Sequence, residues 1–280
     1  MPALSFYELR LRARGVTLTL RIHPEKMFVP NLVSLLSAAV MRVEPGDIFC
    51  DVCSGSGLHA IMAAKLGARQ AYGVDVNPVA VEFARLNARL NGVGDRCRFF
   101  EGDLVAPLAQ KKIKADCLTF TGPQCPSAYA DRPIAPELRT AVNGGPDGSA
   151  VNVRFVREVK TVLAEGGRFY QPTAAWARPS SSLLALREEG YAFRPVFRTS
   201  VPVWGRGNNS RDWFLRHPGS RRLAFDHPEQ AAGRTRILEA RRPSAGRRFA
   251  PLSGESRQRF IEVDFNVRRA AAADGRRKKV

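Results

Sequence analysis

Along the central part of the chain, segments with the apolar pattern of a strand alternate with segments with the apolar pattern of a helix. Short apolar runs bounded by turn residues predict strands at 47–52, 70–75, 97–101, 115–121 and 167–172. Apolar residues at helical spacing predict helices at 57–66, 78–91, 148–164 and 180–189. Because the two kinds of element follow each other through short connections, the pattern predicts a parallel sheet with helices on both faces.

Further strand patterns flank this central part. Residues 16–22 and 190–204 alternate between apolar and polar positions, and 236–241 has the pattern of a last strand. Between the last two, residues 205–233 are rich in Gly, Asn, Arg and Pro. This composition predicts a long insertion, which a compact fold rarely keeps without a use for it.

The chain is expected to contain three regions. They are an N-terminal extension at 1–27 that helps to cover the active site, a domain at 28–242 that contains the insertion, and a basic tail at 243–280. Within the tail, residues 260–267 alternate and can pair as an edge strand, whereas 268–280 are expected to be disordered.

Length and composition indicate one domain with appendages. The 280 residues, 44% of them hydrophobic, can bury a full core. No apolar run approaches the roughly 18 residues that a membrane span needs, and the N-terminus lacks the regions of a secretion signal. The cysteines are odd in number, and the Cys50–Cys53 pair has no second Cys or His pair at zinc spacing. We therefore expect free thiols, no metal, no membrane and a cytoplasmic location.

The net charge of +18 can attract nucleic acid or other anions. The basic residues are mostly arginines spread along the chain, as in proteins encoded by GC-rich genomes. No cluster of basic residues interleaved with aromatic ones resembles an RNA-binding platform. Charge alone therefore does not identify a partner.

Acidic residues end three successive strands of the predicted sheet. Asp51 closes the first strand and is followed by a turn of small residues, in which Gly55 and Gly57 let the backbone bend sharply and a ligand approach. Asp75 closes the second strand, and Asp103 follows the third. The carboxyl ends of parallel strands meet at one edge of the sheet, and the free N–H groups of the helix after the turn favour anionic groups. The arrangement predicts a nucleotide-like ligand across the strand ends.

These three acids and the glycine turn resemble the class I S-adenosylmethionine-dependent methyltransferases, over about residues 27–242. In that family the acids lie, in order, by the methionine moiety, the ribose hydroxyls and the adenine amine. The resemblance implies a doubly wound, Rossmann-like α/β fold with a mostly parallel seven-stranded sheet and an antiparallel last strand. It also implies that S-adenosyl-L-methionine is bound by Asp51, Cys53, Ser54, Gly55, Gly57, Asp75, Val76, Asp103, Leu104 and Thr121. The rival cofactor is NAD, whose fingerprint expects a third glycine; this chain has Ala60 there, which is tolerated, and Ser54 before the glycine pair.

Within that superfamily the chain resembles the N5-glutamine methyltransferases of release factors. Met-Phe-Val-Pro at 27–30, Asn-Gly-Gly-Pro-Asp-Gly at 143–148 and the closing strand at 232–238 are similar to segments of that family. The acceptor motif departs from it, because Thr-Gly-Pro-Gln at 121–124 replaces Asn-Pro-Pro-Tyr. The carboxamide that grips an acceptor NH₂ group and the aromatic lid are both lost.

This departure leads us to expect a small-molecule acceptor, as in specialised metabolite biosynthesis, and not a release-factor glutamine. Methyl transfer needs mainly in-line placement of the nucleophile. The catalytic candidates are Thr121, Gln124 and His59, the last as a general base after the turn. Two alternatives stay open: a protein or RNA N-methyltransferase guided by basic surface, and a protein that binds S-adenosylmethionine for cyclase chemistry or without any activity.

Overall fold

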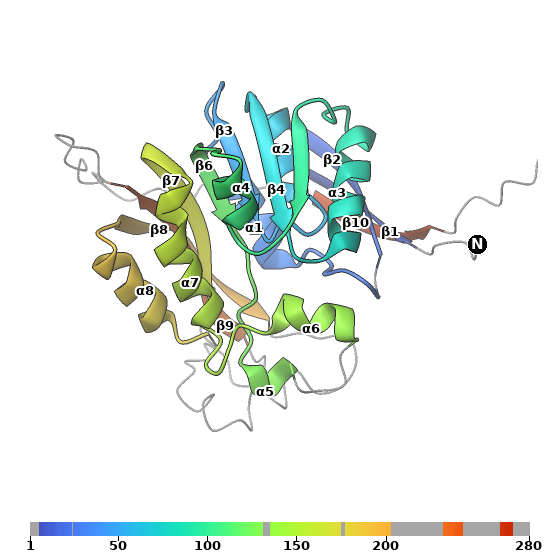
Figure 1. Cartoon of the computed structure of the whole chain (residues 1–280). Coiled ribbons are helices and arrows are strands. Elements are labelled where there is room, and N and C mark those ends of the chain that lie inside the picture. Colours follow the sequence, from blue (N-terminus) through green and yellow to red (C-terminus); the bar gives the residue numbers. More distant parts are fainter. Residues whose placement is uncertain are drawn as a thin grey trace, which may run out of the picture.

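The computed structural model of the chain describes residues 6–23, 25–130, 135–174, 177–202, 232–242 and 264–270. Its centre is a seven-stranded sheet with the order β5-β4-β3-β6-β7-β9-β8 (Figure 1). The strands are β3 (Ile48–Val52), β4 (Gln70–Asp75), β5 (Cys97–Glu101), β6 (Ala115–Phe120), β7 (Leu163–Ala174), β8 (Ala192–Pro202) and β9 (Ala232–Arg241). Neighbouring strands from β5 to β7 run parallel, whereas β9 runs antiparallel to β7 and β8. The predicted α/β fold with an antiparallel last strand is confirmed.

Helices cover both faces of this sheet, each over its own apolar core. One face carries α1 (Leu32–Val40), α2 (Leu58–Lys65) and α3 (Pro78–Leu90), and the other carries α4 (Ala106–Gln110), α7 (Ala150–Glu158) and α8 (Pro179–Glu188). Two short helices, α5 (Ser127–Ala130) and α6 (Pro136–Val142), follow β6 and lie beyond its end (Figure 1). On the second face, Phe155 stacks on Phe120 with ring centroids 4.1 Å apart, which fixes α7 over the sheet.

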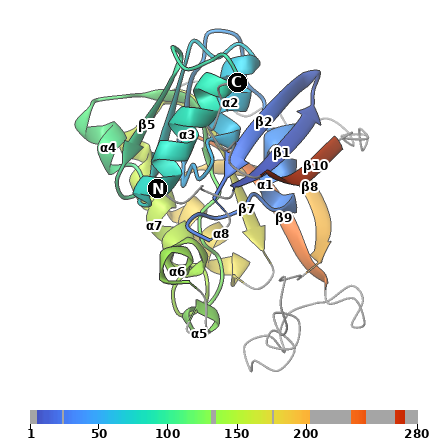
Figure 2. The ribbon, with the colours of Figure 1, turned by 90° about the vertical axis from the view of Figure 1, so that its right-hand side faces the viewer.

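A second, three-stranded sheet packs on the side of α2 and α3. It contains β1 (Phe6–Ala13), β2 (Val16–Ile22) and β10 (Asp264–Ala270), in the order β10-β1-β2 (Figure 2). Its inward residues join the same core as α2 and α3: Leu9, Leu11, Leu18, Leu20 and Ile22. β1 is not among the strands expected from the sequence, although buried Leu9, Leu11 and Ala13 alternate in it with charged residues. The expectation that 268–280 are disordered is wrong for 268–270, because Arg268 pairs in register with Glu8.

Two helices on the main sheet differ from the sequence-based expectation. α1 is not predicted, because its apolar run is buried on most sides and shows no polar face; its start is set by Asn31, whose Oδ1 accepts from the Ser34 N–H at 3.1 Å. The helix predicted at 148–164 ends at Glu158 and is followed by a 3₁₀ turn (Val159–Thr161) before β7 begins. The predicted insertion at 205–233 lies outside the described residues except for 232–233.

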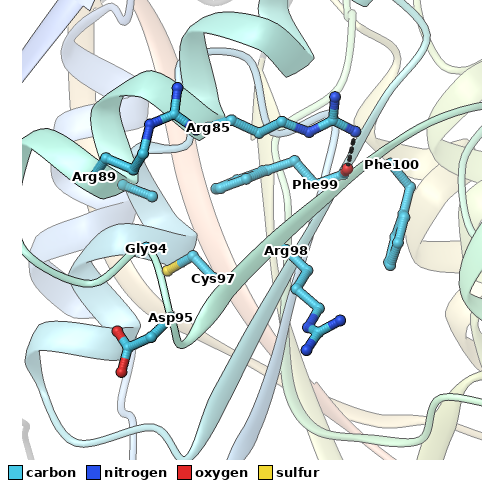
Figure 3. Close-up of a pocket in the computed structure, with 9 residues that line it drawn as sticks. Arg85, Arg89, Gly94, Asp95, Cys97, Arg98, Phe99 and Phe100 are labelled. Atoms are coloured by element: carbon cyan, nitrogen blue, oxygen red, sulfur yellow. Dashed lines mark hydrogen bonds between the residues drawn. The ribbon is translucent and has the colours of Figure 1, made fainter.

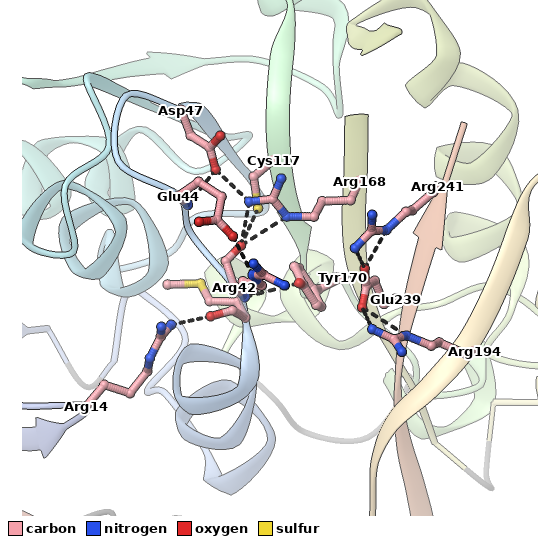
Figure 4. Close-up of polar contacts among 11 residues, drawn as sticks. Arg14, Arg42, Glu44, Asp47, Cys117, Arg168, Tyr170, Arg194, Glu239 and Arg241 are labelled. Carbon is pink, nitrogen blue, oxygen red and sulfur yellow. Dashed lines mark hydrogen bonds and ion pairs between the residues drawn. The ribbon is translucent and has the colours of Figure 1, made fainter. Parts of the chain in front are cut away.

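A buried ion pair fixes the loop after α1 to the sheet (Figure 4). Arg168 of β7 contacts Asp47 at 2.6 Å, and both side chains are only 11% exposed. Arg168 also donates to the Arg42 carbonyl at 2.8 Å, while the Arg42 N–H donates to the Tyr170 hydroxyl at 3.1 Å. These contacts hold the C-terminal end of α1 over β7, so that α1 begins near the ends of the strands. None of the helices in the described segments is long and apolar enough to cross a membrane.

Candidate active site

The turn after β3 bends sharply, as its two glycines predict. Cys53, Gly55 and Gly57 have φ angles of +61°, +50° and +81°, all in the left-handed region. A Cβ at Gly57 would come within 3.0 Å of the Phe99 ring. Glycine is therefore required at Gly57 both for its φ angle and for the close packing under the turn.

Asp75 at the end of β4 joins this turn to the start of α3. Its Oδ2 accepts from the Gly55 N–H at 2.8 Å, and its Oδ1 accepts from the Asn77 N–H at 3.0 Å. Burial raises the pKa of Asp75, although the hydrogen bonds from Asn77 and Gly55 act against it. Val76, the next residue, is 45% exposed and offers an apolar surface beside the carboxylate. The structure thus brings together the glycine turn, Asp75 and Val76.

The N-terminal extension reaches the same site. Asn77 Nδ2 donates to the Lys26 carbonyl at 2.7 Å, which fixes the segment after β2 beside the end of β4. Phe28 and Leu32, which follow it, are 37% and 38% exposed. The role of residues 1–27 as a cover of the active site stays a prediction, and this contact supports it.

Asp103 follows β5 and has a partner that sequence reasoning missed. Its carboxylate forms an ion pair with Arg154 of α7, which also contacts Glu158 at 2.8 Å. Leu104 beside it is buried and has a φ of +44°. The expected contact of Asp103 with the adenine amine stays a prediction, and Arg154 would share that carboxylate.

Asp51 lies inside the protein and not at its surface. The side chain is fully buried, and its Oδ1 accepts from the Thr119 hydroxyl at 2.8 Å and lies 3.3 Å from His59 Nδ1. His59 Nε2 lies 3.0 Å from the Ser34 carbonyl oxygen of α1. His59 is 3% exposed, so its contacts connect α1, α2 and β3. Its predicted role as a general base remains untested.

Several buried polar atoms around the turn have no partner among the described residues. They are Asp51 Oδ2, Ser54 Oγ, Ser56 Oγ and Thr121 Oγ1. A cluster of one carboxylate oxygen and hydroxyls, beside helix-start N–H groups, suits a ligand with an ammonium group, hydroxyls and a carboxylate. S-adenosylmethionine has these groups, and the residues present fit it.

The surroundings of the Cys53 thiol in this turn disfavour its thiolate form. Burial and the negative charges of Asp75, Asp51 and Asp103 raise its pKa well above the ordinary value, so the thiol stays protonated. No group of three or more His, Cys, Asp or Glu side chains in the described segments could hold a metal ion.

The loop at 121–124 packs against the glycine-rich turn at 143–148. Gln124 Oε1 accepts from the Ala174 N–H at 2.9 Å, which ties the loop to the end of β7. Gly148 has a φ of +78°, and a Cβ there would lie 2.4 Å from the Gln124 carbonyl oxygen. In the same turn Asp147 Oδ1 accepts from the Ser149 N–H at 3.0 Å. The loop at 121–124, which replaces the acceptor motif of the glutamine methyltransferases, and the turn at 143–148, which resembles a segment of that family, thus form one unit.

A surface groove of about 580 Å³ lies elsewhere, between α3 and the edge strand β5 (Figure 3). It is lined by Arg85, Arg89 and Arg98, and Arg85 Nη2 donates to the Phe99 carbonyl at 2.7 Å. The groove follows the side of β5 and not the ends of the strands. It is therefore distinct from the site described above.

Comparison with known proteins identifies relatives of this chain among the methyltransferases. The family model of ribosomal protein L11 methyltransferase (PrmA) matches residues 33–118. A protein of Methanocaldococcus jannaschii, provisionally named a protein N5-glutamine methyltransferase, is 32% identical over 183 residues, which are 65% of this chain and 89% of that protein. The release factor glutamine methyltransferase of Moorella thermoacetica is 30% identical over 175 residues, which are 59% of this chain and 55% of that enzyme.

Solved structures share the fold at low sequence identity. The tRNA m1G37 methyltransferase of M. jannaschii superposes with a TM-score of 0.52 at 15% identity, covering 82% of this chain and 55% of that one. A provisionally named methyltransferase in complex with S-adenosylhomocysteine gives 0.54 at 12% identity, covering 83% and 56%. At these identities the comparison concerns the fold alone.

The sheet order, the glycine turn and the acids at the strand ends define a class I S-adenosylmethionine-dependent methyltransferase. Within that class, the chain belongs to the family of the protein N5-glutamine methyltransferases. Its cofactor is S-adenosylmethionine, which supplies an electrophilic methyl group. The names of the relatives point to a macromolecular acceptor, and they do not support the small molecule expected from the sequence.

Proposed function

We propose that this methyltransferase acts on a side-chain amide nitrogen of a protein, the amide of glutamine being the model acceptor. The observation that carries the proposal is the likeness to the M. jannaschii protein, which extends over 89% of that protein. In the structure, the turn at 143–148 packs on the loop at 121–124, and the Gly144 N–H donates to the Cys125 carbonyl at 2.7 Å.

The acceptor loop keeps polar atoms that suit an amide, although it lacks Asn-Pro-Pro-Tyr. Thr121 Oγ1 is buried without a partner in the described part of the chain. Gln124 uses its Oε1 for the Ala174 N–H, and its Nε2 donates to none of the described residues. A primary amide has N–H groups that a hydroxyl oxygen can accept and a carbonyl that an NH₂ group can donate to. Such a pair would orient the amide nitrogen toward the methyl group.

The test is to incubate the full chain with methyl-labelled S-adenosylmethionine and a cell extract separated into protein, RNA and low-mass fractions. We expect label in the protein fraction, and N5-methylglutamine after hydrolysis. Purified release factors, as substrates of the related enzymes, should be assayed in parallel. Label confined to RNA or to the low-mass fraction would overturn the proposal.

A matched pair of variants tests the loop. Thr121→Ser keeps the hydroxyl and should retain methylation, whereas Thr121→Val removes it at nearly constant volume. We expect the second to lose on the order of tenfold or more in rate, with cofactor affinity changed less than the rate. Equal rates for both variants would exclude the hydroxyl from acceptor binding.

A small-molecule acceptor is the second candidate, and the loop itself favours it. Gln124 replaces the aromatic lid of the family, and its side chain is turned to the Ala174 backbone. The low-mass fraction of the same extract tests this candidate directly.

All five cysteines of the chain are free thiols in the structure, so we place the reaction in the reducing cytoplasm.

A further inference from the structure

His59 is a buried residue whose two ring nitrogens both face hydrogen-bond acceptors. Nδ1 lies 3.3 Å from Asp51 Oδ1, and Nε2 lies 3.0 Å from the Ser34 carbonyl oxygen. A carbonyl cannot donate, so Nε2 carries a proton. The contact of Nδ1 with a carboxylate is a hydrogen bond only when Nδ1 carries a second proton, and in that state the pair of Asp51 and His59 holds one proton more than a neutral ring beside an ionised carboxylate.

Among the described residues, Asp51 is the charged group that contacts the His59 ring. The neighbour from α1 is the Ser34 carbonyl, and the neighbour from β6 is the Thr119 hydroxyl, which donates to Asp51. Burial acts to lower the pKa of His59, but the charge of Asp51 and the hydrogen bonds to Asp51 and Ser34 outweigh it and raise that pKa. These contacts favour the protonated form of the ring.

This pair lies between the cofactor turn and the start of α1. On one side, Asp51 Oδ2 is buried without a partner in the described chain, and the charge of Asp51 acts on Cys53 and Asp75. On the other side, the Ser34 N–H and hydroxyl both donate to Asn31 Oδ1, at 3.1 and 3.3 Å. A continuous set of hydrogen bonds therefore joins Asp51 to the N-cap of α1.

We propose that His59 is a positioning residue that shares a proton with Asp51, holds α1 against α2, and releases that proton to solvent when the cofactor binds. The inference rests on the cofactor assignment. S-adenosylmethionine carries an ammonium and a sulfonium group, and a cation in the turn is attracted by Asp51 but repelled by the imidazolium. Binding therefore favours the neutral ring. By linkage, cofactor affinity rises with pH where His59 titrates, by at most about tenfold per pH unit.

Calorimetry of S-adenosylhomocysteine binding to the full chain tests the proposal. This ligand keeps the ammonium group and cannot be consumed. A proton released on binding is taken up by the buffer, and phosphate and Tris differ in ionisation enthalpy. If a fraction of a proton is released, the measured binding heat should therefore differ between the two buffers. His59→Gln should abolish the difference and flatten the pH dependence of affinity. His23→Gln is the matched control, because His23 is also buried but its Nδ1 accepts from the Glu25 N–H and not from a group of the Asp51 pair.

A second measurement needs no variant. The chain has four histidines, so the imidazole resonances of the wild type can be assigned and titrated by NMR. We expect the pKa of His59 to fall when S-adenosylhomocysteine binds. An unchanged His59 titration, or proton release that persists in His59→Gln, would overturn the coupling and leave the cofactor assignment intact. Failure to bind the ligand at all would overturn both.

Discussion

Asn87 of α3 pairs with the backbone of Arg21 in β2 through both ends of its carboxamide. Its Oδ1 accepts from the Arg21 N–H at 2.8 Å, and its Nδ2 donates to the Arg21 carbonyl at 3.0 Å. One helical turn later, Asn91 pairs with Thr19 in the same way, at 3.0 and 2.8 Å. Two side chains on one face of α3 thus supply the hydrogen bonds that a neighbouring strand would otherwise make with the backbone at the edge of β2.

Asn87 also contacts the cofactor turn, because its Nδ2 donates to the Ser56 carbonyl at 3.0 Å. Asn87→Ala should therefore lower the free energy of unfolding by about 2–4 kcal/mol, since buried backbone groups lose their partners. It should also weaken S-adenosylhomocysteine binding. Urea unfolding and calorimetry measure the two effects. Asn91→Ala is the control: it should destabilise the fold but leave ligand affinity nearly unchanged. If both variants bind equally well, Ser56 does not depend on Asn87.

The sequence predicts that the glycine turn and Asp75 lie close together, because the turn follows β3 and Asp75 ends β4, the neighbouring parallel strand. The fold alone brings Asp75 and the glycine turn together, and the observed Gly55–Asp75 bond agrees with that expectation. The partners of these residues cannot be found this way. Asn87 reaches Arg21, and Arg154 reaches Asp103, across 66 and 51 positions of the sequence. Neither pairing leaves a periodic signal.

The acceptor half is harder to predict for a different reason. Its resemblance to a known motif breaks down at Thr121 and Gln124, and the sequence cannot show that Gln124 is turned to the Ala174 N–H. The sequence position of His59 suggests a general base, yet its burial depends on how α1 packs on α2, and the sequence pattern does not reveal α1.

Asp75→Ala tests the cofactor site. The substitution removes the acceptor of the Gly55 and Asn77 N–H groups together with the charge beside the turn. We expect S-adenosylmethionine binding to weaken by at least about tenfold, because one or more charge-assisted hydrogen bonds are lost. Calorimetry measures the affinity, and circular dichroism checks the fold. Asp95→Ala, at an exposed acid on the loop before β5, should change neither. Unchanged affinity in Asp75→Ala would mean that the cofactor is held elsewhere.

The buried ion pair of Arg168 and Asp47 is expected to matter for stability and not for chemistry. Arg168→Met leaves Asp47 with the Glu44 N–H as its remaining donor, at 2.9 Å. Breaking such a pair on one side costs about 3–5 kcal/mol, which urea unfolding would show as a lower midpoint. Arg168→Met combined with Asp47→Leu should recover part of the loss. A single variant within about 1 kcal/mol of the wild type would show that the pair is not a main support of α1.

His59 also predicts a pH dependence of stability. Its pKa in the folded protein is raised, so its contribution is fully present below the unfolded value of about 6.5 and is lost as pH rises through the folded pKa. The ligand-free wild type should therefore lose stability relative to His59→Gln as the pH rises from about 6.5 through the folded pKa of His59. Thermal unfolding of both proteins between pH 6 and 9 measures the difference. Parallel curves would argue against a charged pair with Asp51.

Gly148 connects the acceptor loop to the turn at 143–148, and its substitution can be matched closely. Gly148 and Gly166 both have positive φ angles, +78° and +69°, but a Cβ at Gly166 meets nothing within 4 Å. Gly166→Ala should cost about 1 kcal/mol from backbone strain alone. Gly148→Ala should cost clearly more, because its Cβ collides with the Gln124 carbonyl and must push the acceptor loop aside. We further expect Gly148→Ala to lower methylation while S-adenosylhomocysteine still binds, since the collision is on the acceptor side. Equal effects of the two substitutions on unfolding and on methylation would show that the loop does not depend on this contact.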